Sequence, residues 1–117
     1  MNKHLIAPSI LSADFSKLQS EIEMINNSDA DWFHIDIMDG VFVPNISFGT
    51  PVMKAISKYA KKLLEGHLMI VDPERYIEHF VNFGSDIITV HFEACNDLSF
   101  VIKKIKKFKV KVGVAIN

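Results

Sequence analysis

Apolar residues follow two different spacings along this chain. Five apolar runs, which begin near residues 5, 32, 63, 87 and 110, have the length and composition of buried strands. After each of the first four runs, apolar residues recur every three or four positions, as on the buried face of a helix. The pattern therefore predicts five strands, of which each but the last is followed by one helix.

Capping and turn residues predict where these elements begin and end. Thr50–Pro51 is typical of a helix start, with Thr50 as the N-cap, and Asp72–Pro73 repeats the same device. Gly84 is expected to end the helix that follows Pro73. Asn96 or Asp97 is expected to cap the last helix. The aromatic stretch 41–49 is too long for a tight turn, and it suits a loop that covers a pocket.

Strands that alternate with helices predict repeated βαβ units, and therefore an α/β fold with a parallel sheet. The open doubly wound sheet and the (β/α)8 barrel share this pattern. No Gly-x-Gly-x-x-Gly sequence follows any of the strands, so the barrel is favoured. In a barrel of this kind the active site gathers at the carboxyl ends of the strands. The polar residues expected there are Ser9 or Ser12, His34, Asp36, His67, His91, Glu93 and Asn117.

Composition narrows the range of partners. The 117 residues are 49% hydrophobic and 23% charged, with a formal net charge of -1, as expected for one globular domain. That charge provides no basic surface for nucleic acid and no polybasic membrane arm, so the expected partner is a small molecule. Cys95 is the only cysteine, which excludes an intramolecular disulfide. The first residues lack the apolar run of a signal peptide, so the cytoplasm is the expected location.

His34 and Asp36 are candidates for a metal site. They are two residues apart in the second strand, so both side chains project to one face while Ile35 and Ile37 project to the other. Imidazole nitrogen and carboxylate oxygen suit zinc or iron, and His67 in the third strand is the candidate third ligand. A histidine beside an aspartate is also common as a hydrogen-bonded pair in a protein core. The residues alone leave both interpretations open.

Four sequence motifs resemble those of the ribulose-phosphate 3-epimerase family. They are residues 7–15 (APSILSADF), 34–45 (HIDIMDGVFVPN), 67–71 (HLMIV) and 89–93 (TVHFE), and their order and spacing match over the whole chain. The resemblance implies a metal-dependent (β/α)8 barrel that interconverts D-ribulose 5-phosphate and D-xylulose 5-phosphate.

The resemblance also implies roles for individual residues. His34, Asp36 and His67 match three of the family's four ligands for one divalent ion, which is zinc, iron, manganese or cobalt. Asp36 matches one of the two carboxylates that act as acid and base on opposite faces of an enediolate. These roles suit the chemistry, because removing a weakly acidic proton beside a ketone requires stabilisation of the negative charge that develops.

A second group of residues is expected to contact the substrate. Ser9 matches the substrate-contacting serine of the first strand, and His67 faces the same pocket. Met38 and Met69 match methionines that line the pocket beside the metal.

The length of the chain departs from the family. A (β/α)8 barrel has about 250 residues, and this chain has 117. We expect residues 1–117 to be the N-terminal portion of one barrel, with four βα units and a fifth strand, and without the fourth ligand, the second acid/base group and the phosphate site. The open sheet edges of such a portion predict a homo-oligomer.

Two other functions stay open at this point. One is an epimerase for a related ketose phosphate, such as D-allulose 6-phosphate. The other is a truncated metal-binding fragment without turnover.

Overall fold

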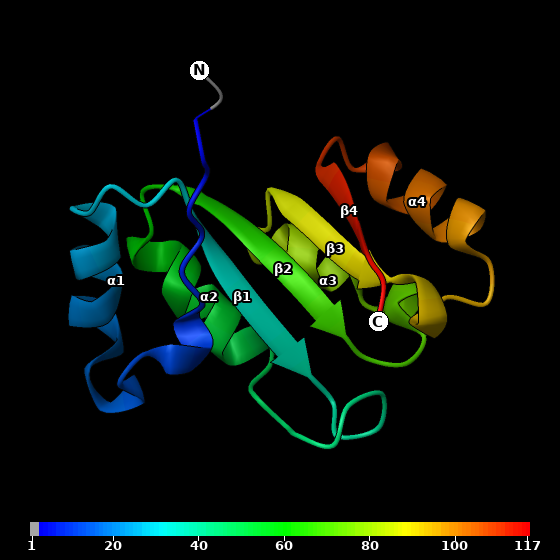
Figure 1. Cartoon of the computed structure of the whole chain (residues 1–117), viewed down its shortest axis with the longest axis horizontal. Coiled ribbons are helices and arrows are strands. Elements are labelled where there is room, and N and C mark those ends of the chain that lie inside the picture. Colours follow the sequence, from blue (N-terminus) through cyan, green and yellow to red (C-terminus); the bar gives the residue numbers. More distant parts are fainter. Residues whose placement is uncertain (1–2) are drawn as a thin grey trace.

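The computed structural model describes residues 3–117, which fold around one parallel sheet (Figure 1). The strands are β1 (Trp32–Met38), β2 (Leu63–Met69), β3 (Ile87–His91) and β4 (Lys111–Ala115), and they lie in sequence order across the sheet. The α-helices are α1 (Leu18–Asn26), α2 (Thr50–Tyr59), α3 (Ile77–Asn82) and α4 (Leu98–Lys107). Short 3-10 helices span Ile10–Ser12, Phe15–Lys17, Pro73–Arg75 and Phe92–Ala94. The predicted α/β class with a parallel sheet is confirmed.

The prediction of a first strand at residues 5–11 is wrong, because these residues form only an isolated bridge. Residues 5–11 run beside β1, where the backbone N–H of His34 donates to the Pro8 carbonyl at 3.0 Å. A single parallel bridge joins Ser9 to His34. Regular pairing does not extend further, because Pro8 has no N–H to donate and Ile10 already begins a 3-10 helix. The segment nevertheless brings Ser9 alongside the second predicted strand.

Two helix starts also differ from the prediction. Thr50 is the first residue of α2, and Gly49 is its N-cap, with no side-chain hydrogen bond. Asp72 does not cap an α-helix. It has a left-handed backbone with φ of 47° and leads into a 3-10 turn, so α3 begins only at Ile77. Residues on both sides of Pro73 therefore form a tight turn where a helix start was expected.

Two caps follow the prediction. Gly84 has a φ of +101°, a conformation that glycine adopts without steric cost, just after α3. The Asp97 side chain accepts a hydrogen bond from the backbone N–H of Phe100 at the start of α4. The backbone freedom of glycine therefore ends α3, and a side-chain hydrogen bond begins α4.

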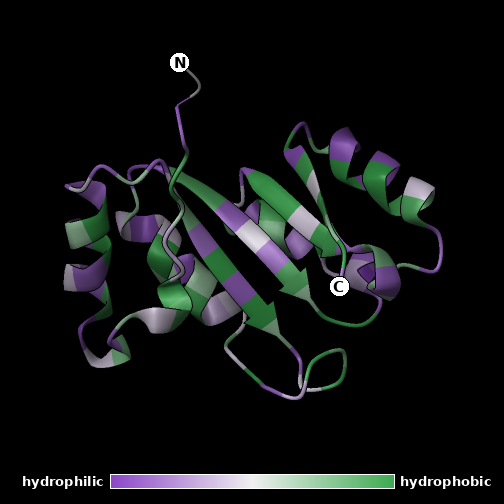
Figure 2. Ribbon diagram, in the orientation of Figure 1, coloured by the Kyte–Doolittle hydropathy of each residue, from purple (hydrophilic) through white to green (hydrophobic). Residues whose placement is uncertain are grey.

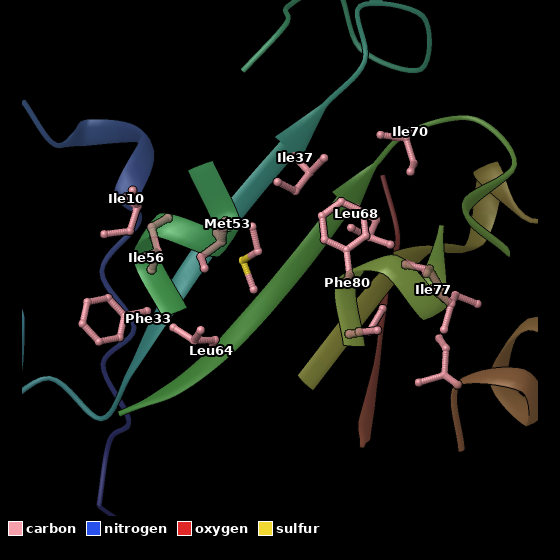
Figure 3. Packing of buried hydrophobic residues seen from close by; sticks show 14 of the residues in the cluster. Ile10, Phe33, Ile37, Met53, Ile56, Leu64, Leu68, Ile70, Ile77 and Phe80 are labelled. Carbon is pink, nitrogen blue, oxygen red and sulfur yellow. The ribbon is translucent and has the colours of Figure 1, made fainter. Parts of the chain in front are cut away.

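The two faces of the sheet differ in chemistry. Burial alternates along β1, where Phe33, Ile35 and Ile37 are buried on one face, and hydrophilic and hydrophobic bands alternate along this strand in Figure 2. In Figure 1 helices α2 and α3 lie behind the strands, and no helix crosses in front of them. Figure 3 shows the side chains of the helix-covered face packed together, among them Met53 and Ile56 of α2. The polar positions of the strands are left for the uncovered face.

None of the helices within residues 3–117 is long and apolar enough to cross a membrane.

Candidate metal and acid/base site

Strand register brings the three predicted metal ligands together. Asp36 of β1 and His67 of β2 are paired neighbours across the parallel ladder, and His34 is one same-face step earlier on β1. Asp36 Oδ1 lies 3.0 Å from His34 Nε2 and 2.9 Å from His67 Nδ1, and the two nitrogens are 3.1 Å apart. The three side chains offer ligand atoms that all lie within 4.8 Å of one another. This group could therefore hold a metal ion.

Ser9 contacts the other oxygen of the Asp36 carboxylate. Its hydroxyl donates a hydrogen bond to Asp36 Oδ2, while Oδ1 faces the two histidines. Burial opposes ionisation of Asp36, but the Ser9 hydrogen bond and the two histidines outweigh it and lower the pKa of the carboxyl below its usual value. Asp36 is thus held as a carboxylate whose two oxygens have different neighbours.

Glu65 of β2 forms a hydrogen bond with Nδ1 of His34, the ring nitrogen that does not face Asp36. Its Oε2 lies 2.9 Å from His34 Nδ1 and accepts from the Trp32 indole N–H at 2.8 Å, and its Oε1 accepts from the Thr89 hydroxyl at 2.8 Å. The hydrogen bond with His34 is the main reason that the pKa of Glu65 falls to about 2. The same hydrogen bond raises the pKa of His34 against the opposing effect of burial.

His91 extends the cluster to β3. Its Nε2 lies 2.8 Å from His67 Nε2, and the two rings stack with centroids 4.9 Å apart. Burial lowers the pKa of His91, and the neighbouring His67 adds to that shift. A neutral His91 can accept a hydrogen bond from His67 Nε2, and that arrangement leaves Nδ1 of His67 as the free nitrogen that faces Asp36.

Comparison with known proteins decides the family. The model of the ribulose-phosphate 3 epimerase family matches residues 5–117. The chain belongs to this family. A Synechocystis sp. protein named ribulose-phosphate 3-epimerase is 48% identical over 120 residues, which cover 100% of this chain and 52% of the relative.

Further relatives carry related names. The Bacillus subtilis ribulose-phosphate 3-epimerase is 48% identical over 112 residues, covering 96% of this chain and 52% of the relative. The Arabidopsis thaliana protein named ribulose-5-phosphate-3-epimerase, chloroplastic, is 39% identical over 115 residues, covering 97% of this chain and 41% of the relative. This member of the epimerase family spans about half the length of the curated relatives it matches.

The two methionines predicted to line the pocket lie next to the group of candidate metal ligands, further along the same strands. Met38 and Met69 are paired neighbours at the carboxyl ends of β1 and β2, one same-face step past Asp36 and His67. Met38 also lines a cavity of about 440 Å³ with Phe48 of the 41–49 loop. That cavity does not include the three candidate ligands. The loop therefore covers a pocket, as predicted, but a different one from the candidate metal site.

Sequence reasoning assigned no role to Glu65 or Thr89 in this member of the family. Glu65 is two residues before His67, so the strand period alone places both on one face. That signal was available, but the contact with His34 depends on register between strands. Cys95 carries no sign of reactivity, because burial raises the pKa of its thiol.

Proposed function

We propose that residues 1–117 form the N-terminal portion of a (β/α)8 barrel that epimerises D-ribulose 5-phosphate at C3 to give D-xylulose 5-phosphate. The observation that carries this proposal is the convergence of His34, Asp36 and His67 at neighbouring strands in a chain of the epimerase family. Ser9 would contact the substrate from the segment beside β1. Met38 and Met69 would line the sugar pocket at the carboxyl ends of their strands.

The donor set fits a single divalent ion. Two imidazole nitrogens and one carboxylate oxygen match the preferences of zinc, iron, manganese or cobalt, and they would leave open positions for a fourth ligand and substrate. His34 Nε2, His67 Nδ1 and Asp36 Oδ1 are the atoms that would hold it. An ion bound there would supply positive charge beside the enediolate oxygens of the substrate.

Asp36 is assigned the proton transfer at C3. Its Oδ1 is directed at the two histidines, so Oδ2 is the oxygen left to accept or return a proton. The Ser9 hydroxyl on Oδ2 keeps the carboxylate ionised and fixes its orientation. Ser9 and Asp36 would therefore act as one unit on one face of the substrate.

Inversion at C3 requires a second acid/base group on the opposite face. Within residues 3–117 the convergent ligand group contains one carboxylate, that of Asp36. Glu93 is not part of that group, and its Oε1 accepts from the backbone N–H of Asn117. We assign the second carboxylate, the fourth ligand and the phosphate site to barrel units beyond β4.

An assay of a chimaera tests the proposal. Residues 1–117 would be joined to the part of the Bacillus subtilis relative that follows its matched region. We expect epimerase activity on D-ribulose 5-phosphate with zinc, iron, manganese or cobalt, together with deuterium incorporation at C3 in D2O. Asp36→Asn should abolish both while the circular dichroism spectrum is unchanged. Turnover by that variant at the unaltered rate would contradict the role of Asp36.

The same assay separates the other two functions. Faster turnover of D-allulose 6-phosphate than of D-ribulose 5-phosphate would favour a related ketose-phosphate epimerase. Metal binding without C3 exchange, in both the chimaera and the 117-residue chain, would favour a binding fragment without turnover.

We also propose that the chain self-associates through β4. In the part of the chain that the structure describes, β4 pairs only with β3, and Val114 and Ile116 beside its free edge are 42% and 76% exposed. An unpaired edge with apolar neighbours is a template for strand pairing. Sedimentation should show a dimer or higher oligomer, and a monomer at high concentration would contradict this.

A further inference from the structure

Glu65 is a part-buried carboxylate that the proposed reaction does not use. It belongs to the same face of β2 as His67, and its side chain is 14% exposed. Groups from both neighbouring strands contact its two oxygens: His34 and Trp32 from β1, and Thr89 from β3. A carboxylate held from two sides in this way differs from a surface ion pair, which has solvent as its main partner.

The partners of Glu65 decide where the proton of His34 lies. An ionised carboxylate only accepts hydrogen bonds, so a ring nitrogen 2.9 Å from Glu65 Oε2 must donate. His34 therefore carries a proton on Nδ1. A neutral imidazole has only one N–H, which leaves the lone pair of Nε2 free. Nε2 is the atom that lies 3.0 Å from Asp36 Oδ1 and 3.1 Å from His67 Nδ1.

We infer that Glu65 is a positioning residue that keeps His34 in its Nδ1–H form and so presents the Nε2 lone pair to a divalent ion. This role rests on the proposed metal site. Histidine ligands commonly donate their second ring N–H to a carboxylate, which fixes the tautomer and the ring orientation. Without Glu65, the nearest acceptor for the proton of His34 is Asp36 Oδ1, and a proton on Nε2 would block metal binding.

Thr89 and β4 hold Glu65 in turn. The Thr89 hydroxyl donates to Glu65 Oε1, and Thr89 pairs with Gly113 in the ladder. A Cβ at Gly113 would overlap the Thr89 hydroxyl oxygen and would lie 3.1 Å from the Thr89 Cβ. The absence of a side chain at Gly113 therefore leaves the space that Thr89 occupies. Residues of all four strands therefore contribute to the orientation of His34.

Glu65→Gln is the decisive substitution because it retains the shape of the side chain. The Trp32 indole N–H can only donate, so the amide oxygen should face Trp32 and His34, while the amide NH2 faces Thr89, whose hydroxyl can also accept. The hydrogen bond to His34 then persists but loses its charge. Glu65→Met removes the acceptor as well. The two variants therefore separate the charge from the acceptor.

The experiment measures Co²⁺ and Zn²⁺ affinity of the purified chain by competition with a chromogenic chelator. We expect Glu65→Gln to weaken binding about 10-fold and Glu65→Met up to about 100-fold. In the Zn²⁺-loaded chain, the Nδ1–H proton resonance of His34 should move upfield in Glu65→Gln. It should be lost to solvent exchange in Glu65→Met.

Two control variants separate positioning from stability. Trp32→Phe removes a hydrogen bond to the same oxygen but leaves the carboxylate, so it should lower the melting temperature while changing metal affinity less than about three-fold. Glu78→Gln alters an exposed carboxylate of α3 and should change neither.

The outcomes distinguish this inference from the proposed function. Unaltered affinity and an unaltered Nδ1–H signal in folded Glu65→Gln and Glu65→Met would overturn the positioning role and leave the metal site standing. An equal loss of affinity in Trp32→Phe would also overturn it, because the effect would then be structural. Absence of metal binding by the unaltered chain would overturn the metal site itself, and with it this role of Glu65.

Discussion

Gly113 lies where two strands approach too closely for any side chain. A Cβ built on Gly113 of β4 would overlap the Thr89 hydroxyl oxygen, and it would lie 3.1 Å and 3.2 Å from the Thr89 Cβ and Cγ2 atoms. We therefore expect Gly113→Ala to destabilise the fold. A loss of stability would be informative, because replacing glycine by alanine in a strand otherwise stabilises the fold by about 0.5–1 kcal/mol.

The free-energy cost of Gly113→Ala depends on how Thr89 and β4 respond to the added Cβ. Either Thr89 rotates and loses its hydrogen bond to the Glu65 carboxylate, which costs about 1.5–3 kcal/mol, or β4 shifts at an overpacking cost of about 1–3 kcal/mol. After the gain from alanine is subtracted, Gly113→Ala should lower the free energy of unfolding by about 1–2 kcal/mol. Thr89→Ala alone loses the same hydrogen bond and should cost about 2 kcal/mol.

A double-mutant cycle tests whether the two residues are coupled. In the double variant the clashing hydroxyl and methyl are gone and only the Cβ of residue 89 remains, 3.1 Å from the added Cβ, so Gly113→Ala should then cost much less than it does beside Thr89. The coupling free energy should be about 1–2 kcal/mol. Urea denaturation of the four proteins provides the values, read from the shift of the midpoint at constant m.

Additive costs in this cycle would refute the reasoning. If Gly113→Ala destabilised the chain equally with and without the Thr89 side chain, to within about 0.5 kcal/mol, the overlap would not be the cause. A stabilising Gly113→Ala in the otherwise unaltered chain would show that β4 moves away freely. In that case β4 would not help to hold Thr89 against Glu65.

Two further predictions concern pH and the core. The pKa of Glu65 is lowered from 4.5 to about 2, so its contribution to stability is complete above 4.5 and is lost as the pH falls through about 2. The stability gap between the unaltered chain and Glu65→Gln in urea titrations should therefore narrow between about pH 5 and pH 2, and a constant gap would contradict the shift. Phe33 is fully buried, so Phe33→Ala should cost about 3–5 kcal/mol by urea denaturation. The 55% exposed Phe100 is the control, and Phe100→Ala should cost less than about 0.5 kcal/mol.

Short-range periodicity was enough to predict most of the fold. The alternation of His34, Ile35, Asp36 and Ile37 assigned one face to chemistry and the other to packing, and the structure buries both isoleucines. Helical spacing likewise predicted the buried face of α4, where Val101 is among the residues at the core. These predictions succeed because each depends on the spacing within one element.

The elements that sequence reasoning misplaced depend on local backbone geometry, which the spacing of apolar residues does not record. Residues 5–11 are apolar enough for a strand, but Pro8 offers no N–H and the 3-10 helix at Ile10 withdraws the chain from β1. Asp72–Pro73 matches a helix start in sequence, yet the left-handed backbone of Asp72 turns the chain before α3. Nothing in the spacing of apolar residues reports such turns.

The residues of the candidate site likewise fall into those that the sequence predicts and those that only the structure reveals. His34, Asp36 and His67 were within reach of sequence reasoning because two of them share a strand and the third follows one strand later. Glu65 was not, because its role exists only in the register that sets it beside His34.

The register also links the site to the stability of the sheet. Because Glu65 accepts from Trp32 on one side and Thr89 on the other, a change in the pairing of β2 with either neighbour would move the carboxylate away from His34. A one-residue slip would turn Glu65 and His67 to the helix-covered face. Metal affinity should therefore fall with any substitution that shifts this register, even one that contacts no ligand.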